Sequence, residues 1–227
     1  MSLFVHLHVH SEYSPMYGAS TIEVLCQAAK RHGATSLALT DTNGLYGAIR
    51  FIEVAREYGL RPILGAELRH QTHRALCLIK DHSGYANLCQ IISQRHCHPD
   101  FDFLQAVRDY RRGLIIASDD PQVLMVWKRQ SKTDLYVELT PGVLMHQAFA
   151  VSRRLGLPPV ATNRVAFASP DEFPIHRTSL VAGRGDSRRL CRCHAYRLSP
   201  GCFDRPVLSP AYVMIKEKQP LSVSNDK

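Results

Sequence analysis

The sequence lacks the features that would place the chain in or across a membrane. No apolar run approaches the roughly 18–20 residues of a membrane-spanning helix. The first ten residues, MSLFVHLHVH, contain no Lys or Arg of the kind that opens a signal peptide. We therefore expect a cytoplasmic protein without membrane contact. In that compartment the seven cysteines are expected to be reduced thiols rather than a disulfide framework.

The sequence also lacks the short motifs of several functional classes. It has no G-x-S-x-G motif of a serine hydrolase. Gly183-Arg184-Gly185 is not a phosphate-binding loop, because no strand pattern precedes it and no helical pattern follows. Cys191-Arg192-Cys193-His194 has C-x-C instead of C-x-x-C spacing and no second ligand pair. That spacing indicates chance clustering rather than a zinc knuckle.

Positive charge is concentrated near the C-terminus. The formal net charge is +8, but residues 177–227 hold 10 Lys and Arg against 4 Asp and Glu. Residues 1–176 hold the other 18 basic and 16 acidic residues, a net charge of +2. The overall basicity is therefore no argument that the main body binds nucleic acid. Arg108, Arg111 and Arg112 form a small basic group, for which contact with DNA or a neighbouring domain and a solvated helix end both stay open.

Short apolar runs alternate with helical patterns over residues 1–176. The first helix opens on the capping-box spacing of residues 20–23 and ends at Gly33. The other expected elements are strands at 4–8, 36–40, 62–64, 75–79, 114–117, 135–138 and 160–161 and helices at 48–58, 85–93, 103–110, 121–128 and 144–155. Repeated βα units predict a parallel sheet, open or closed into a barrel. Functional residues are then expected at the C-terminal ends of its strands.

Histidines and carboxylates follow these strands. His6, His8 and His10 alternate along the first strand and so share one face. An H-x-H pair can serve a common cation, although histidines often only solvate a strand end. Asp41 follows the second strand and Glu67 ends the third. Because a βα barrel gathers strand ends around one mouth, His8, His10 and Glu67 are a candidate N/O cluster for Zn, Mn or Fe.

Several segments together resemble a known family. They are LHVHSEYS, LALTDTNGLYGAIRFIEVA, RPILGAEL, LCLIKDHSGYANLCQIIS, RRGLIIASDD, LYVELTPG and GLPPVATNRVAFASPDEFPIH. In this order and spacing they closely resemble the PHP (polymerase and histidinol phosphatase) domain. They are most similar to the PHP domain that opens the bacterial C-family DNA polymerases, the DNA polymerase III alpha subunits. HSEYSPMYGAS and ELTPG are similar to the error-prone, translesion branch of these polymerases.

The resemblance covers about 176 of the 227 residues. It implies an α/β fold, a distorted (β/α)7 PHP-type barrel over residues 1–176, followed by an irregular basic C-terminal tail at 177–227. It also implies a metal cluster in the barrel mouth. In metal-competent relatives a trinuclear site hydrolyses phosphoesters, and in some polymerases it removes 3′ nucleotides.

Carried over residue by residue, the resemblance gives an incomplete metal site. His8, His10 and Glu67 fill ligand positions. His96 lies where a ligand histidine can occur, and Asp120 lies where some polymerases have Cys. These five residues are the metal-site candidates. They would form a vestigial site, and whether it holds an ion or is empty stays open.

Other ligand positions of the family hold residues that are poor ligands. Tyr17 takes the place of a His or Asp, and Thr42 takes that of the histidine in the Thr-Asp-His motif. Arg164 and Ala166 replace both ligands of the closing Asn-Asp-x-His pattern. A guanidinium repels metal and is expected to pair with Glu67 or Asp120. Three states stay open: a full catalytic cluster, one residual Zn or Mn ion on the three retained ligands, and a metal-free structural barrel.

The function expected from the resemblance is that of the N-terminal PHP domain of a C-family polymerase in DNA replication or translesion synthesis. Its partners would be the rest of the polymerase and DNA, with no small-molecule substrate. With the site degraded, the domain would be structural and would not synthesise DNA by itself. One alternative is a free-standing metal-dependent phosphoesterase, histidinol-phosphatase-like or a 3′–5′ exonuclease, which should keep the late Asp-x-His pair. The other is a binding module that holds DNA or a protein in the mouth.

The last fifty-one residues follow no sustained strand or helix period, and no element is expected from Arg177 onward. We hypothesise that the reading frame changes near Arg177 and that the chain is a truncated piece of a longer polymerase gene. Sequencing the coding DNA tests this, because another frame after codon 177 should then resume a polymerase-like helix. A genuine disordered basic tail is the alternative.

Overall fold

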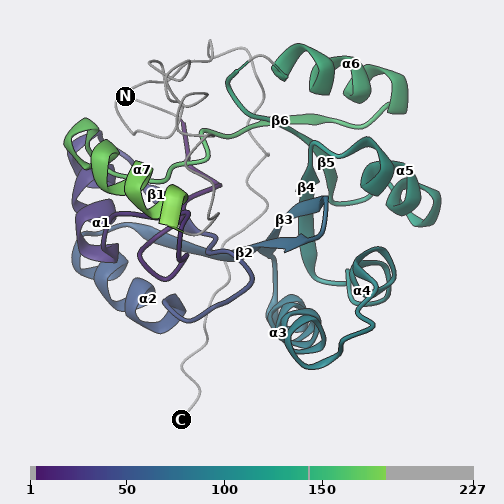
Figure 1. Ribbon diagram of the computed structural model, residues 1–227, viewed down its shortest axis with the longest axis horizontal. Helices are drawn as coiled ribbons and strands as arrows, with labels where there is room; N and C mark the ends of the chain where they lie inside the picture. The colour runs from purple at the N-terminus through teal and green to yellow at the C-terminus, as the bar shows by residue number, and fades with distance from the viewer. Residues whose placement is uncertain (1–3, 143, 183–227) are drawn as a thin grey trace.

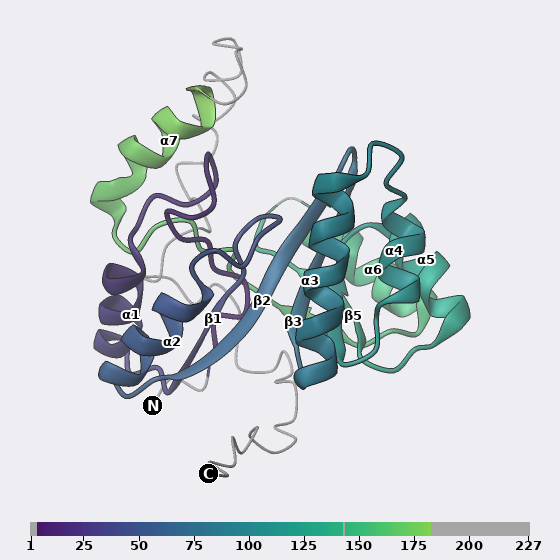
Figure 2. The ribbon, with the colours of Figure 1, turned by 90° about the horizontal axis from the view of Figure 1, so that it is seen from below.

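The structure is a computed structural model that describes residues 4–142 and 144–182 (Figure 1). Six strands form one curled sheet in which they lie in the order of the chain, and all helices but the last lie around its outside as in half of a barrel (Figures 1 and 2). The predicted α/β class is therefore confirmed. Across the described ranges, no helix combines the length and apolar character that a membrane span requires.

Between residues 22 and 161 the helices and strands keep the predicted order with shifted bounds, whereas the last two elements were not predicted. The elements are α1 (Ile22–Arg31), β1 (Ser36–Leu39), α2 (Ala48–Glu57), β2 (Arg61–His70), β3 (His73–Ile79), α3 (His82–Cys97), α4 (Phe103–Asp109), β4 (Leu114–Ser118), α5 (Pro121–Gln130), β5 (Leu135–Leu139), α6 (Met145–Leu155), β6 (Pro159–Ala161), a 3-10 turn η1 (Pro170–Glu172) and α7 (Phe173–Ala182). Side-chain caps fix several helix starts. Asp81, Asp102 and Asp120 each accept a backbone N–H at the start of α3, α4 and α5.

The expected all-parallel sheet is wrong at β3. That strand runs antiparallel to both β2 and β4, whereas β1–β2, β4–β5 and β5–β6 are parallel. Only Gln71 and Thr72 join β2 to β3, and Gln71 adopts a left-handed φ of 51°. A two-residue connection leaves no room for a crossover helix, so the chain must turn back as a hairpin.

The strand expected at residues 4–8 is also wrong. The structure has one isolated bridge there, in which Val9 pairs in parallel with Val165. Beside it, the Val9 N–H donates to the Thr40 side-chain oxygen at 2.8 Å instead of to a backbone carbonyl. A side chain thus takes the place of one backbone hydrogen bond of a regular strand pair. The segment still lies between β1 and residue 165, with backbone hydrogen bonds to both.

The C-terminal end of the described chain also differs from expectation. Helix α7 continues to Ala182, although no element was expected from Arg177 onward. Its start is fixed by a capping box in η1, in which Ser169 and Glu172 satisfy each other's backbone N–H groups. The helix therefore crosses the boundary drawn at residue 176, and that division of the chain stays a prediction. Residues 183–227, with the rest of the predicted tail and the Cys191–Cys193 motif, lie outside the described residues.

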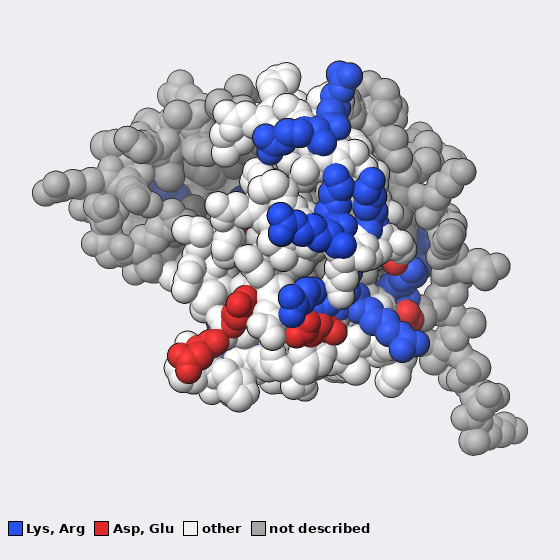
Figure 3. All heavy atoms as spheres, turned by 90° about the vertical axis from the view of Figure 1, so that its right-hand side faces the viewer, with Lys and Arg blue, Asp and Glu red and all other residues white. Residues whose placement is uncertain are grey.

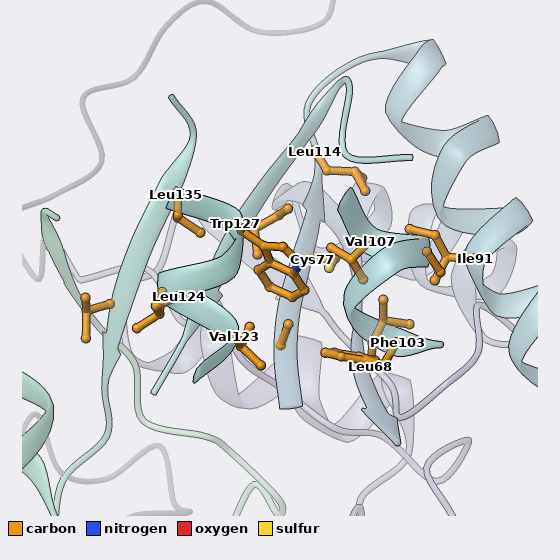
Figure 4. Close-up of a cluster of buried hydrophobic side chains, with 14 of the residues drawn as sticks. Leu68, Cys77, Ile91, Phe103, Val107, Leu114, Val123, Leu124, Trp127 and Leu135 are labelled. Carbon is orange, nitrogen blue, oxygen red and sulfur yellow. The ribbon is translucent and has the colours of Figure 1, made fainter. Parts of the chain in front are cut away.

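Two apolar clusters hold the helices to the sheet. One packs α3, α4 and α5 against the sheet around Trp127, whose indole N–H donates to the Leu104 carbonyl at 3.0 Å (Figure 4). The other packs α1 and α2 against β1 and includes Val9 and Val165. Cys26 and Cys77 are buried in these clusters, whereas Cys89 is only half-buried. Both clusters lie outside the sheet curve, and a smaller apolar cluster around Leu76, Leu78 and Val160 shares the inner side with polar groups.

Candidate functional site

Two histidines reach the inner side of the sheet from the N-terminal segment. The His10 N–H donates to the Val165 carbonyl, and the Val165 N–H donates to the His8 carbonyl. These bonds hold the segment on either side of Val9. The His8 and His10 rings are both buried, with their Nε2 atoms 3.1 Å apart. The i, i+2 spacing thus brings two imidazoles to one point, as the alternation of the sequence predicts.

Glu67 completes a group of three possible ligands. One ligand atom each from His8, His10 and Glu67 lie within 4.8 Å of one another, and all three residues are buried. Glu67 was expected to end its strand, but it does not. It lies inside β2, which continues to His70. Two imidazole nitrogens and a carboxylate are a donor set that suits Zn or Mn.

Three arginines surround the Glu67 carboxylate. Arg69 binds both oxygens, with Nε 2.6 Å from Oε2 and Nη2 2.8 Å from Oε1. Arg74 Nη1 lies 3.2 Å from Oε1, and Arg164 Nη2 lies 3.4 Å from the same oxygen. The contact of Arg164 with Glu67, one of its two expected partners, is therefore confirmed. The other two arginines were not predicted, and they place three guanidinium groups around one fully buried carboxylate.

Glu138, on β5, is a second buried carboxylate that the sequence did not reveal as part of the site. Its Oε1 lies 2.6 Å from His8 Nδ1 and accepts the Thr162 hydroxyl at 2.7 Å. Its Oε2 lies 3.1 Å from Arg74 Nη1. The signal that could have found it is a lone carboxylate among the apolar residues of the strand LYVEL.

The pKa values follow from this packing. Burial lowers the pKa of His8, but Glu138 and Glu67 outweigh burial and raise that pKa to about 9. For His10, burial dominates, and together with His8 and the arginines it lowers the pKa to about 3. Burial opposes ionisation of Glu138, but Arg74 and His8 lower its pKa to about 2. The pKa of Glu67 also lies well below its usual value, because hydrogen bonds from Arg69 and His8 outweigh burial. At neutral pH both carboxylates are thus ionised, the His8 imidazole is protonated and positively charged, and the His10 imidazole is neutral.

Asp41 serves the turn beside the site rather than the ligand group. Its carboxylate accepts the Ser11 N–H at 2.7 Å, the Ser11 hydroxyl at 2.8 Å and the Ser14 hydroxyl at 2.6 Å. Ser14 Oγ also lies 3.2 Å from His10 Nδ1. Asp41 therefore fixes the loop that orients the His10 ring. Thr42, at the position where the family has histidine, lies 3.4 Å from Glu67 Oε2.

The other two predicted ligands lie on the wall of the cleft. The cleft is about 1100 Å³ and is lined by Tyr17, Arg69, His96, Asp120 and Arg164 among others. His96 is exposed, and its Nε2 lies 2.8 Å from the Asn43 carbonyl oxygen. Asp120 caps α5 and lies 2.7 Å from His73 Nδ1. Within the described ranges, neither joins the three-residue ligand group.

The comparison with protein families decides the assignment. The family model described as "PHP domain" matches residues 6–144. The chain belongs to the PHP domain family. Among solved structures, a two-domain protein with a predicted PHP-like metal-dependent phosphoesterase from Bacteroides vulgatus matches with a TM-score of 0.55 at 14% identity, over 72% of this chain and 52% of that one. An amidohydrolase from Chromobacterium violaceum matches with a TM-score of 0.52 at 15% identity, over 74% of this chain and 89% of that one. At these identities the likeness concerns the fold of the PHP domain.

Curated relatives of this PHP domain are DNA polymerases. The DNA polymerase III subunit alpha of Buchnera aphidicola is 29% identical over 219 residues, which cover 81% of this chain and 19% of the relative. The error-prone DNA polymerase of Symbiobacterium thermophilum is 47% identical over 94 residues, covering 41% of this chain and 9% of the relative. The chain thus spans at most about a fifth of the length of these relatives.

The donor set of this PHP domain fits one ion better than several. His8, His10 and Glu67 have the donor atoms and mutual distances for one Zn or Mn ion. To bind it, Glu67 would have to exchange guanidinium contacts for the metal. A multinuclear cluster fits less well, because the described residues hold no second group of three ligands and Arg164 places a positive charge 3.4 Å from Glu67 Oε1.

Proposed function

We propose that this chain is the N-terminal PHP module of a C-family bacterial DNA polymerase, and that the module is structural rather than hydrolytic. The observation that carries the proposal is the contact of Glu67 with Arg69, Arg74 and Arg164. In a hydrolytic PHP site, divalent cations would neutralise the central carboxylate. Here guanidinium groups of the chain supply that positive charge, and they can neither polarise a phosphoester as a Lewis acid nor activate a bound water.

The link to a polymerase rests on the curated relatives. DNA polymerase III alpha subunits match over about four-fifths of this chain. The higher identity to an error-prone DNA polymerase over 94 residues favours the translesion branch. DNA synthesis would belong to the longer protein, with its other domains and DNA as partners, in the cytoplasm as the sequence suggests. The module would then support the polymerase body.

A second candidate is a metal-dependent phosphoesterase, of the histidinol phosphatase or 3′–5′ exonuclease kind. It is favoured by the three ligand atoms of His8, His10 and Glu67 within 4.8 Å of one another. One ion on these ligands could bind a phosphate and generate hydroxide near neutral pH. This candidate requires that the ion compete with the arginines for Glu67.

The metal content of the purified full-length chain separates the two candidates. We expect elemental mass spectrometry to find far less than one equivalent of Zn or Mn, and no hydrolysis of bis-p-nitrophenyl phosphate or of a 3′ DNA end. About one equivalent per chain, lost in His8→Ala/His10→Ala but kept in the exposed control His96→Ala, would overturn the structural proposal. A thermal melt of each variant shows that the folds are comparable.

A gain-of-function variant tests the role of the arginine directly. Arg164→Asp/Ala166→His restores both residues of the family's closing pattern. If the arginine excludes metal, this variant should bind more Zn or Mn than the wild-type chain under the same loading. If Arg164→Ala alone loads no more metal than wild type, and neither does the restored variant, the guanidinium is not what keeps the site free of metal.

A further inference from the structure

A strongly basic surface covers one side of the molecule, away from the cleft. Figure 3 shows Lys and Arg side chains in a column along this side, with the acidic side chains confined to its lower part and edge. Six cations on it have no ion pair within the described part of the chain. We call these six residues the basic face: Arg112, Lys128, Arg129, Lys132, Arg153 and Arg154.

The topology explains why these cations gather. Helices α4, α5 and α6 each run into the N-terminal end of a strand, namely β4, β5 and β6, and those strands are parallel. Their last turns therefore lie at the same end of the sheet. Arg111 joins two of them, since its guanidinium donates to the carbonyls of Trp127 and Ser131 at 3.1 and 3.2 Å. The cleft is at the other end, where Asp120 and Arg164 follow β4 and β6.

The charge of the basic face exceeds what helix capping requires. Cations in a last turn stabilise the helix dipole, and α1 and α2 carry them too. On those helices acidic residues offset most of the charge, as in the pairs of Arg50 with Glu23 and Glu53. Helices α5 and α6 contain no Asp or Glu at all. The nearby Asp134 pairs with Lys80 at 2.7 Å, and Glu138 is buried.

We propose that the basic face binds the phosphate backbone of nucleic acid without reading its sequence. Five of its six cations are exposed, and Lys128 is half-buried. Four of the six are arginines, whose planar fork suits phosphate oxygens. Duplex DNA offers one phosphate charge per roughly 1.7 Å of its axis, so a row of unpaired cations can contact several phosphates at once. This binding goes beyond the structural role proposed above and does not depend on it, because no group of the metal site takes part.

The test compares two variants of the full-length chain with equal charge. Arg129→Gln/Arg153→Gln/Arg154→Gln removes three cations from the basic face. Lys30→Gln/Arg31→Gln/Arg56→Gln removes three exposed cations from α1 and α2. Binding to a fluorescent 20-base-pair DNA duplex is measured by anisotropy over a range of salt concentrations. All substituted side chains are exposed, and thermal melts check that both folds are kept.

We expect the basic-face variant to weaken binding about ten-fold or more and to lower the slope of log K against log salt by about 2 to 3, since each lost phosphate contact removes about 0.9. The control variant should match wild type, and Arg129→Lys/Arg153→Lys/Arg154→Lys should keep most of the affinity. Equal loss of affinity in both Gln variants would overturn the proposal, because binding would then depend only on net charge. Loss in neither variant would also overturn it, because another segment of the chain would then bind the DNA. If polyglutamate of equal charge competes as well as DNA, the face suits an acidic protein and the nucleic-acid assignment is wrong.

Discussion

The Nδ1 atom of His8 lies 2.6 Å from Oε1 of Glu138, so a buried contact joins the N-terminal segment to β5 across 130 residues of chain. The other Glu138 oxygen faces Arg74, which also reaches Glu67. One connected set of charges thus ties together the N-terminal segment, the β2–β3 hairpin and β5. An apolar cluster lies beside these charges inside the sheet curve, and it includes Leu76 and Leu78 of the hairpin.

Removing the charge of Glu138 should destabilise the fold. Glu138→Gln removes the anion that faces both Arg74 and protonated His8 and leaves Glu67, which Arg69 and Arg164 also contact, as their remaining fully buried anion. Breaking a buried ion pair in this way costs about 3–5 kcal/mol. We expect urea denaturation to show a loss of that order in the free energy of unfolding. Asp134→Asn is the matched control, because it breaks the surface pair with Lys80 and should cost at most about 1 kcal/mol. Equal losses in both variants would show that the buried pair has no special weight.

A side chain at Gly18 should disturb the loop that orients His10. A Cβ atom there would collide with the backbone carbonyl of Ser11, which cannot move as a flexible side chain can. Gly18→Ala is expected to cost on the order of 1–3 kcal/mol, as overpacking does. Gly44→Ala is the control, because its Cβ would meet only the Tyr46 ring, which is 68% exposed and free to rotate. Urea denaturation of both variants measures the difference, and a Gly18 variant as stable as the Gly44 variant would contradict the geometry.

The described cysteines should differ widely in reactivity. Burial raises the pKa of the Cys26 and Cys77 thiols to about 12, in Cys26 with a contribution from Glu23. Cys97 is exposed at the end of α3. With iodoacetamide at pH 8, peptide mapping should find Cys97 labelled in the native protein, and Cys26 and Cys77 labelled only after unfolding in urea. Early labelling of Cys77 would show that the Trp127 cluster opens readily.

The docking of α7 should weaken in mild acid. Burial lowers the pKa of His176, whose ring lies 5.5 Å from that of Phe167. The folded state therefore favours the neutral imidazole, whereas the unfolded chain takes up a proton below about pH 6.5. The contribution of His176 to stability is complete above pH 6.5 and is lost as the pH falls below that value.

A His176→Phe variant isolates this residue from the other histidines. It keeps an aromatic ring against Phe167 and cannot titrate. Thermal midpoints of wild type and variant should diverge between pH 7.5 and pH 5, with the wild type losing more. Parallel curves for the two proteins would mean that His176 is not the group that titrates.

Most helices could be predicted from the sequence, because caps and apolar periods are local signals. The β2–β3 hairpin could not, since Gln71 and Thr72 carry none of the Gly or Asn residues that normally mark a two-residue turn. The prediction therefore continued the parallel βα repeat at the point where the chain turns back as a hairpin. The N-terminal strand failed for a related reason, because the bond from Val9 to the Thr40 side chain depends on a tertiary contact.

The site was predictable where one short extended segment fixes the geometry. His8 and His10 converge because of their spacing, the expected strand ends and the resemblance both pointed to Glu67, and the resemblance supplied Arg164. Arg74 faces the same carboxylate only through the hairpin register, which pairs it with Arg69. Glu138 reaches His8 only through the curvature of the sheet. Such partners depend on register and curl, neither of which a single sequence pattern encodes.

The arginines around Glu67 have a consequence for how uniform the protein is. A barrel that relies on bound ions exists as a mixture of filled and empty molecules, and the proportions follow the supply of metal. Here the positive charge beside Glu67 comes from Arg69, Arg74 and Arg164, which are part of every copy of the chain. If the site takes no ion, as proposed above, each folded molecule then carries the same charge at this point whether metal is scarce or abundant.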